Sequence, residues 1–446
     1  MVPRIAGVLF AATALAFAGP ADIQRTMRLL ATSTPAHRNP VRILFYGQSI
    51  TKQEWSQLVA QDLRTRFPYA ELIVENRAIG GYSAEFLIRT LPHDVYDFYP
   101  DLIIFHDFGG EDKYEQIIAE IRRHTTSEIM VQSDYPTWVP TAEEPQNEAK
   151  TKREAFHEKH SYEWLPSLCE KYRCEVVDVR RPWIEHLRKN NLKASAVLAD
   201  GVHLNGPGNQ LLAEITSGYL KYSPSLAPDD EPVQTIRSPK FDKGKLSIPF
   251  EGNRVEVVAE MGGAYHEDAA NILIDGRRPS TFPELYYITR PTDTYAVDWP
   301  AVNRVSAEKP LIVEDWTMRV LETNADDSQW RFSVTGSKTG ENGVGTSTER
   351  FVSKSGRVVI EPTDYGVNRA YKLRHQLTPV NFEVKWSVIP QFTDTYRAPR
   401  VADPSRDYVT LLASGLSNGK HTLGLFSTGK TDPPIREIRI YKPQGK

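Results

Sequence analysis

Val41-Arg-Ile-Leu-Phe-Tyr46 is a short, mostly apolar run that leads directly into Gly47-Gln-Ser49. A run of this length that ends at a glycine predicts a buried β-strand followed by a tight turn. Gly47 lets the backbone turn without a clash from a Cβ atom. The next segment, 54–67, carries apolar side chains at helical spacing, namely Trp55, Leu58, Val59 and Leu63. This part of the chain is therefore predicted to be a strand, a turn and a helix.

The same alternation continues as far as about residue 222. Further strands are predicted at 71–75, 101–106, 128–132 and 176–179, and helices at 83–91, 113–123, 149–172 and 208–220. Strands and helices that alternate in this way are typical of a parallel sheet covered by helices on both faces, here an α/β domain over 40–222. Ligands of such sheets bind beyond the carboxyl ends of the strands, so functional residues should follow the first three strands.

The second half of the chain has a different pattern. A polar, Pro-rich stretch over 223–240 is predicted to be a linker. Beyond it the helical period disappears, and about ten strand-like segments follow, separated by turns such as Asp275-Gly276 and Asn418-Gly419. This pattern predicts an all-β sandwich, jelly-roll-like, over 241–446, with room for an insertion at 277–362.

Composition excludes several classes of protein. Of 446 residues, 54 are Lys or Arg and 57 are Asp or Glu, for a formal net charge of -3. With no long basic run there is no electrostatic case for a nucleic-acid partner. Two cysteines exclude a disulfide-dense scaffold and a four-cysteine zinc site. For Cys169 and Cys174, a short local disulfide and two buried thiols both remain open.

Residues 1–18 are predicted to be a secretory signal peptide. Arg4 is followed by an apolar run from Ile5 to Phe17 and by Ala16-Phe-Ala18, the pattern of a cleavable leader. The run is shorter than the roughly 20 apolar residues that span a bilayer, although a membrane anchor and a buried helix are alternatives. No later stretch is long and apolar enough for a membrane span. The protein is therefore expected to be secreted or periplasmic, without stable membrane insertion.

A serine, a histidine and an aspartate stand at opposite ends of the predicted α/β domain. Ser49 lies in the turn after the first strand, and Asp200-Gly-Val-His203 precedes the last helix. A serine hydroxyl needs a base such as His203, and a carboxylate such as Asp200 must orient the imidazole. Taken singly, Ser49 also suits a helix N-cap, and Asp200 with His203 suits a polar surface turn. Taken together, the three residues favour a nucleophilic serine.

A third motif follows the second strand. In Asn76-Arg-Ala-Ile-Gly-Gly81 a glycine amide can donate to an oxyanion, although paired glycines also simply make a turn. With Gly47-x-Ser49 and Asp200-x-x-His203, this motif resembles the SGNH hydrolases, also called GDSL esterases and lipases, over residues 40–222.

The resemblance has several implications for the fold and the site. It implies a flavodoxin-like, three-layer α/β/α domain of SGNH type. Ser49 would be the nucleophile, His203 the base and Asp200 its orienting carboxylate. The backbone amides of Ser49 and Gly81 would form part of the oxyanion hole.

Two positions depart from the family pattern. The family usually has Asp before the serine, where this chain has Gln48. After the third strand it has Gly-x-Asn-Asp, whose Asn completes the oxyanion hole, whereas this chain has no asparagine in 106–112. Losing one such donor typically costs ~10²–10³ in turnover. An amide of Gly109 or Gly110, the His106 ring or the Gln48 side chain can replace it, unless the site is degenerate.

The acidic and histidine residues near the third strand have simpler explanations than metal binding. His106 suits a buried strand end, and Glu111 and Asp112 suit the start of a helix. No His-Glu-x-x-His or paired-Cys spacing is present, and His157 with His160 lies on a charged helix. We therefore expect no metal and no cofactor.

These observations predict an exported serine esterase that removes acyl groups, first of all acetyl, from a polysaccharide. A neutral sugar polymer requires no electrostatic steering. Trp316, Trp330 and Trp386 in the second half would suit stacking on sugar rings, but at strand spacing they suit a core better. A lipase or phospholipase of the same family is one alternative, and a carbohydrate-binding protein with a degenerate hydrolase site is another.

Overall fold

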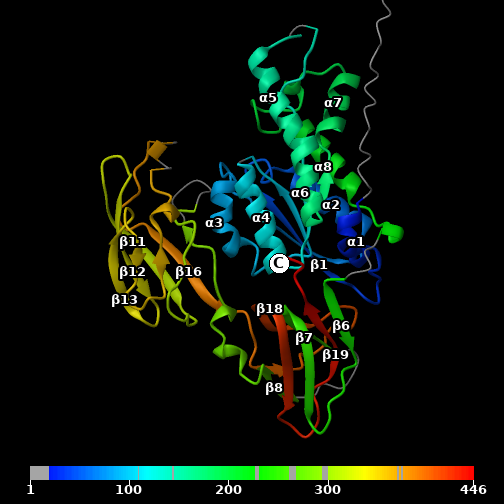
Figure 1. Ribbon diagram of the computed structural model, residues 1–446, viewed down its shortest axis with the longest axis vertical. Coiled ribbons are helices and arrows are strands. Elements are labelled where there is room, and N and C mark those ends of the chain that lie inside the picture. Colours follow the sequence, from blue (N-terminus) through cyan, green and yellow to red (C-terminus); the bar gives the residue numbers. More distant parts are fainter. Residues whose placement is uncertain are drawn as a thin grey trace, which may run out of the picture.

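The computed structural model describes residues 20–108, 110–142, 145–226, 231–260, 268–293, 300–368, 371–372 and 375–445. The predicted signal peptide and Gly109 lie outside these ranges. The described chain forms a central α/β domain and two β lobes, one beside the domain and one below it in the view of Figure 1. No described helix is long and apolar enough to cross a membrane.

The central domain contains one parallel sheet. Its strands are β1 (Pro40–Gly47), β2 (Glu71–Asn76), β3 (Leu102–His106), β4 (Glu128–Gln132) and β5 (Glu175–Val177), in the order β2-β1-β3-β4-β5. This is the order of flavodoxin-like, doubly wound sheets, so the predicted α/β class is confirmed. The order reverses between β1 and β3, and the crevice for a ligand is expected where these two strands end.

Helices cover both faces of the sheet because β1 is apolar on both sides. Ile43 and Phe45 enter one hydrophobic core, and Leu44 and Tyr46 enter another. The first core also contains residues of α1 (Gln24–Ala31), α2 (Trp55–Arg66), α7 (Arg180–Lys189) and α8 (Gly206–Tyr219). The second contains residues of α3 (Ala84–Asp94), α4 (Glu111–His124) and α6 (Leu165–Tyr172).

Three details of the α/β domain differ from the expectations or decide between alternatives that the sequence left open. The helices α1 and α7 were not predicted. The single helix predicted over 149–172 consists of α5 (Glu148–Lys159), a π-helical turn (His160–Trp164) and α6. Cys169 and Cys174 are buried free thiols.

The lobe below the sheet, here called the terminal lobe, is one antiparallel sheet. Its order is β17-β8-β18-β7-β19-β6. The strands are β6 (Val233–Arg237), β7 (Lys245–Ala259), β8 (Ala269–Ile274), β17 (Thr395–Arg397), β18 (Val409–Ser427) and β19 (Ile435–Tyr441). Ile248 and Val257, from the two halves of the long β7, share one core. The strand β6 lies inside 223–240, so this stretch is not only a linker.

The second lobe, here called the insert lobe, lies between β8 and β17 in the sequence. Its sheet contains β9 (Tyr286–Ile288), β10 (Thr292–Asp293), β11 (Asp315–Thr323), β12 (Trp330–Gly336), β13 (Gly340–Thr346) and β16 (Glu383–Pro390). A hairpin of β14 (Phe351–Val352) and β15 (Val359–Ile360) accompanies it. The insertion therefore extends beyond residue 362, because β16 pairs with β11 inside this sheet.

Each β lobe has its own hydrophobic core, so the expectation of a single sandwich over 241–446 is corrected to two antiparallel sheets. Alternating apolar residues identify strands, but they do not say which strands pair. Trp316, Trp330 and Trp386 are buried in the core of the insert lobe, which agrees with their strand spacing.

Candidate active site

Ser49 lies in the loop that joins β1 to α2. The loop is closed by hydrogen bonds from Lys52 N to Gln48 O (3.2 Å) and from Gln53 N to Ile50 O (3.1 Å). The helix α2 begins only at Trp55. Ser49 is therefore not the N-cap of α2, which was the alternative explanation for this residue.

The three predicted catalytic residues lie together. Ser49 Oγ is 2.9 Å from His203 Nε2, and His203 Nδ1 is 2.8 Å from Asp200 Oδ2. Because Nδ1–H donates to the carboxylate, the lone pair of Nε2 faces the Ser49 hydroxyl, as a general base requires. The side chains of His203 and Asp200 are 42% and 58% exposed, so the set opens to solvent.

The loop before α8 holds Asp200 in place. Its Oδ1 accepts hydrogen bonds from the backbone amides of Val202 and His203, each 2.7 Å long. The backbone bond from His203, its ring and the Val202 amide lower the pKa of Asp200 to about 2. A further bond from Ala199 N to His203 O (2.8 Å) closes the loop. The carboxylate is thus ionised at neutral pH and its position is defined.

Two residues that the sequence analysis missed hold this loop against its neighbours. Gln53 donates to Leu204 O (2.9 Å) and accepts from Leu204 N (3.0 Å), which ties the serine loop to the histidine loop. Tyr135 donates its hydroxyl to Val202 O (2.5 Å) and stacks on Trp183. No pattern marks Gln53, whereas Tyr135 follows the fourth strand, at the sheet edge where functional residues are expected.

The loop after β2 passes beside Ser49. It is fixed to β1 by a hydrogen bond from Ile79 N to Gly47 O (2.9 Å). A Cβ atom built on Gly80 would lie 3.8 Å from Ser49 Cβ. Gly81 has φ +71°, which a glycine adopts without strain. Among the described residues, nothing accepts a hydrogen bond from the amide of Ser49 or of Gly81, so both can serve a substrate oxygen.

Asn76, which opens this loop, supports the serine loop instead of facing the substrate. Its Nδ2 donates to Thr51 O (2.8 Å) and Ser56 Oγ (2.9 Å), and its Oδ1 accepts from Ala78 N (3.0 Å). The side chain thereby joins the end of β2 to the serine loop and to the first turn of α2.

The groups that could replace the missing asparagine differ in whether their N–H donors are already used. The Gly110 amide donates to Glu85 Oε1 at 2.9 Å, so it is already in use. Gly109 lies outside the described residues. Gln48 is buried, and its Nε2 has no hydrogen-bond partner among the described residues. Gln48 is therefore a candidate that retains an unused N–H donor.

His106 belongs to a buried cluster at the ends of β3 and β4. Asp134 accepts from His106 Nε2 (3.2 Å) and from His157 Nδ1 (2.6 Å). Burial by itself would raise the pKa of Asp134, but the hydrogen bonds from both histidines outweigh it and lower the pKa. With its Nε2 proton used here, a neutral His106 ring has no proton on Nδ1 for an oxyanion. No group of three or more metal-ligating side chains occurs among the described residues.

A second Ser-His-Asp set lies on the terminal lobe, but its histidine is engaged elsewhere. His421 Nδ1 contacts Asp275 (2.7 Å), and His421 Nε2 lies 3.3 Å from Ser417 Oγ. Nε2 also lies 2.9 Å from the carbonyl oxygen of Ser417, which only accepts hydrogen bonds. This shorter contact competes with the Ser417 hydroxyl for Nε2, which therefore does not face the hydroxyl as a base. Ser417 is a useful control for Ser49.

No protein-family model and no curated protein matches this sequence. Among solved structures, the acetyl xylan esterase AlAXEase is 21% identical, with a TM-score of 0.33, over 40% of this chain and 98% of that one. Axe2, an acetylxylan esterase from Geobacillus stearothermophilus, is 16% identical, with a TM-score of 0.35, over 44% of this chain and all of that one.

A further match covers both halves of the chain. CEX, a two-domain esterase active on acetylated mannans, is 11% identical, with a TM-score of 0.35, over 96% of each chain. Similarity at this level does not support a function, so a proposed function must rest on the geometry of the site.

Proposed function

We propose that this protein is a serine esterase of SGNH type that removes acyl groups, first of all acetyl, from a polysaccharide after export from the cytoplasm. The observation that carries the proposal is the chain of hydrogen bonds from Ser49 through His203 to Asp200, 2.9 and 2.8 Å long. It lies where the strand order of the sheet reverses, next to two backbone amides with no described acceptor.

The reaction follows from these positions. Ser49 Oγ attacks the ester carbonyl while His203 Nε2 takes the hydroxyl proton, and the ionised Asp200 stabilises the imidazolium. The amides of Ser49 and Gly81 stabilise the negative carbonyl oxygen of the tetrahedral intermediate. The tetrahedral intermediate then collapses, the bond between the carbonyl carbon and the sugar oxygen breaks, and His203 gives its proton to that oxygen, which leaves as a hydroxyl. A water molecule, deprotonated by His203, hydrolyses the acyl-enzyme and releases the carboxylic acid and free Ser49.

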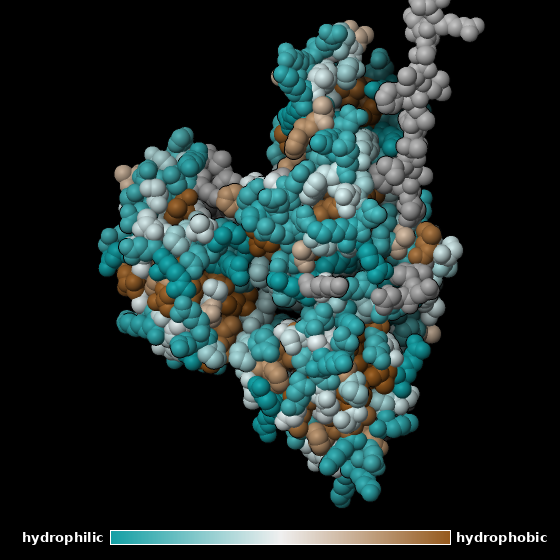
Figure 2. Space-filling model, viewed as in Figure 1, coloured by the Kyte–Doolittle hydropathy of each residue, from teal (hydrophilic) through white to brown (hydrophobic). Residues whose placement is uncertain are grey.

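The surroundings of the site favour a polymer over a lipid surface. His203 and Asp200 are open to solvent, so a bulky chain can reach Ser49 without entering a deep cavity. The one face of the molecule seen in Figure 2 is mostly hydrophilic, with small groups of hydrophobic residues on the β lobes. A lipase would instead be expected to present a broad apolar patch for its substrate.

The first test compares hydrolysis of p-nitrophenyl acetate by the wild type and by Ser49→Ala. We expect kcat to fall by at least roughly 10³-fold, because the nucleophile is removed. Ser417→Ala is the matched control and should retain the wild-type rate. Equal rates for the wild type and Ser49→Ala would contradict the enzyme assignment.

The second test concerns the substrate class. Acetate release from acetylated xylan and mannan is compared with hydrolysis of long-chain p-nitrophenyl esters, and we expect the wild type to prefer the polysaccharides. Turnover of long-chain esters without acetate release would replace the proposal with a lipase. Binding of these polysaccharides without any hydrolysis would identify a carbohydrate-binding protein with a degenerate site.

A further inference from the structure

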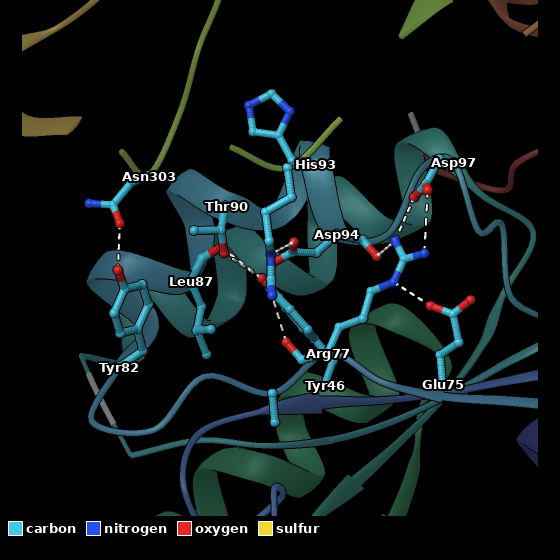
Figure 3. A network of polar contacts seen from close by, with 12 residues as sticks. Tyr46, Glu75, Arg77, Tyr82, Leu87, Thr90, His93, Asp94, Asp97 and Asn303 are labelled. Carbon is cyan, nitrogen blue, oxygen red and sulfur yellow. Dashed lines mark hydrogen bonds and ion pairs between the residues drawn. The ribbon is translucent and has the colours of Figure 1, made fainter. Parts of the chain in front are cut away.

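The insert lobe contacts the loop that presents Gly81. Tyr82, the next residue, donates its hydroxyl to Asn303 Oδ1 of the insert lobe at 2.6 Å. Figure 3 shows Tyr82 in the loop that leads into α3, with its hydroxyl directed at Asn303. Both residues are only 2% exposed. A hydrogen bond this deeply buried does not exchange with water, and losing one partner leaves the other unsatisfied.

Asn303 is itself held firmly. Its backbone amide donates to Asp364 O at 2.7 Å, within the insert lobe. Two residues later, Val305 N donates to His93 Nε2 on α3 at 3.2 Å. His93 in turn uses Nδ1 to donate to Ile288 O of the insert lobe at 2.7 Å. The segment around Asn303 therefore has a defined position relative to α3.

The Gly81 loop is thus anchored on two sides. One anchor is the backbone bond from Ile79 to Gly47 at the end of β1 (2.9 Å), and the other is the contact of Tyr82 with Asn303. This matters because the chain has no asparagine where the resemblance expects one, which leaves the backbone amides of Ser49 and Gly81, with the Gln48 side chain as a further candidate donor, to hold the oxyanion. The position of the Gly81 N–H is then more important for the reaction, since a small displacement of such a donor lowers the rate.

We propose that Asn303 is a positioning residue of the esterase site, which fixes the Gly81 amide through Tyr82. The inference rests on the proposed function and makes the insert lobe part of the catalytic unit, although the lobe supplies no residue of the Ser49–His203–Asp200 set. The lobe acts on the oxyanion hole and leaves the attacking groups untouched.

The test uses the full-length protein and p-nitrophenyl acetate. Tyr82→Phe removes only the hydroxyl, and Asn303→Leu removes its acceptor. Each is expected to lower kcat roughly tenfold with KM changed less than about twofold, since the oxyanion forms only in the transition state. The rate at which an activated phosphonate labels Ser49 should fall by a similar factor. Asn303→Asp keeps an acceptor for Tyr82 and should retain most of kcat.

A neighbouring contact supplies the control. Arg89 of α3 donates to Asp364 at 2.6 Å, in the same interface but outside the Gly81 loop. Arg89→Gln should weaken the interface and leave kcat within about twofold of the wild type, because Arg89 contacts neither Tyr82 nor Asn303 in the described structure. Thermal unfolding confirms that each variant is folded before its kinetics are compared.

Two results would overturn the inference while leaving the esterase in place. One is unchanged kcat and phosphonate labelling in folded Tyr82→Phe and Asn303→Leu. The other is an equal loss in Arg89→Gln, which would make the effect a general one of the interface. A wild type that hydrolyses no ester would refute the proposed function and this inference together.

Discussion

Asp200 shows how a carboxylate on the surface acquires a fixed role. Its side chain is exposed, yet two backbone amides and the His203 ring hold its oxygens at 2.7–2.8 Å. The hydrogen bonds to the charged form explain why its pKa is lowered to about 2. The spacing of three residues between Asp200 and His203 allows both the side-chain bond and the backbone turn.

Asp200→Asn is expected to lower kcat roughly 10³–10⁴-fold, because an amide does not hold the imidazole in the reactive tautomer. The pH profile of the wild type tests the same residue. With a pKa of about 2, the carboxylate of Asp200 is ionised above that pH and becomes neutral only as the pH falls through it. The acid limb of kcat/KM, measured from pH 4 to 9, should therefore contain no contribution from Asp200 and have a slope no greater than one. A limb with a slope of two would contradict this.

At the scale of elements, the serine loop depends on how closely β1 and β3 approach. Gly47 pairs with His106, and a Cβ atom built on Gly47 would lie 2.0 Å from the His106 carbonyl oxygen. The backbone of Gly47 also has φ +146°. The turn after β1 is one reason for a glycine at this position, and the close approach of β3 is a second reason that the sequence did not indicate.

Gly47→Ala is expected to destabilise the protein by roughly 2–4 kcal/mol, because a buried main chain must move to admit the methyl group. Urea unfolding measures the loss, and kcat should fall as well, since Ser49 follows two residues later. Gly218→Ala is the control, because a Cβ atom there meets nothing within 4 Å. Gly218 lies in α8, where alanine is favoured by about 1 kcal/mol. Equal stability of Gly47→Ala and the wild type would contradict the steric argument.

At the scale of the molecule, the two β lobes have different relations to the site. The terminal lobe contacts residues near the amino ends of the strands, where Tyr99 donates to Asn253 (3.0 Å) and Asn253 donates to His124 O (2.8 Å). The insert lobe lies along α3, which begins two residues after Tyr82 and ends at Asp94 (Figures 1 and 3). The insert lobe is therefore the one in a position to influence catalysis.

An ion pair between the insert lobe and the α/β domain tests how strongly these two parts are joined. Arg290 of the insert lobe contacts the carboxylate of Asp94 at 2.5 Å, and Asp94 is fully buried. Arg290→Met should lower the free energy of unfolding by roughly 3 kcal/mol, because it leaves a buried charge without its partner. Arg319→Met, at an exposed pair with Glu383, should cost less than about 1 kcal/mol in the same urea titration. Equal losses in the free energy of unfolding of the two variants would show that this pair does not join the insert lobe to the α/β domain.

Much of the α/β domain could be predicted because its signals are local. The strands at 41–46, 71–75, 101–106 and 128–132 are apolar runs, and all four occur in the parallel sheet. In β1, β3 and β4 this apolar character follows from burial on both faces, whereas the edge strand β2 is only partly buried. In the second half, alternation predicted strands but not their partners, so the two separate sheets and the place of β16 were missed.

The sequence by itself determined the α/β class and identified Ser49, Asp200 and His203 as candidate catalytic residues. The class follows from periodic patterns of apolar residues, and the three residues lie in short motifs. Only the tertiary structure decided which side chains hold the site together. Gln53 and Leu204 are 151 positions apart, and Tyr82 and Asn303 are 221 apart. Such pairs leave no periodic trace in one sequence, because a single polar residue gains its partner only when distant segments pack against each other.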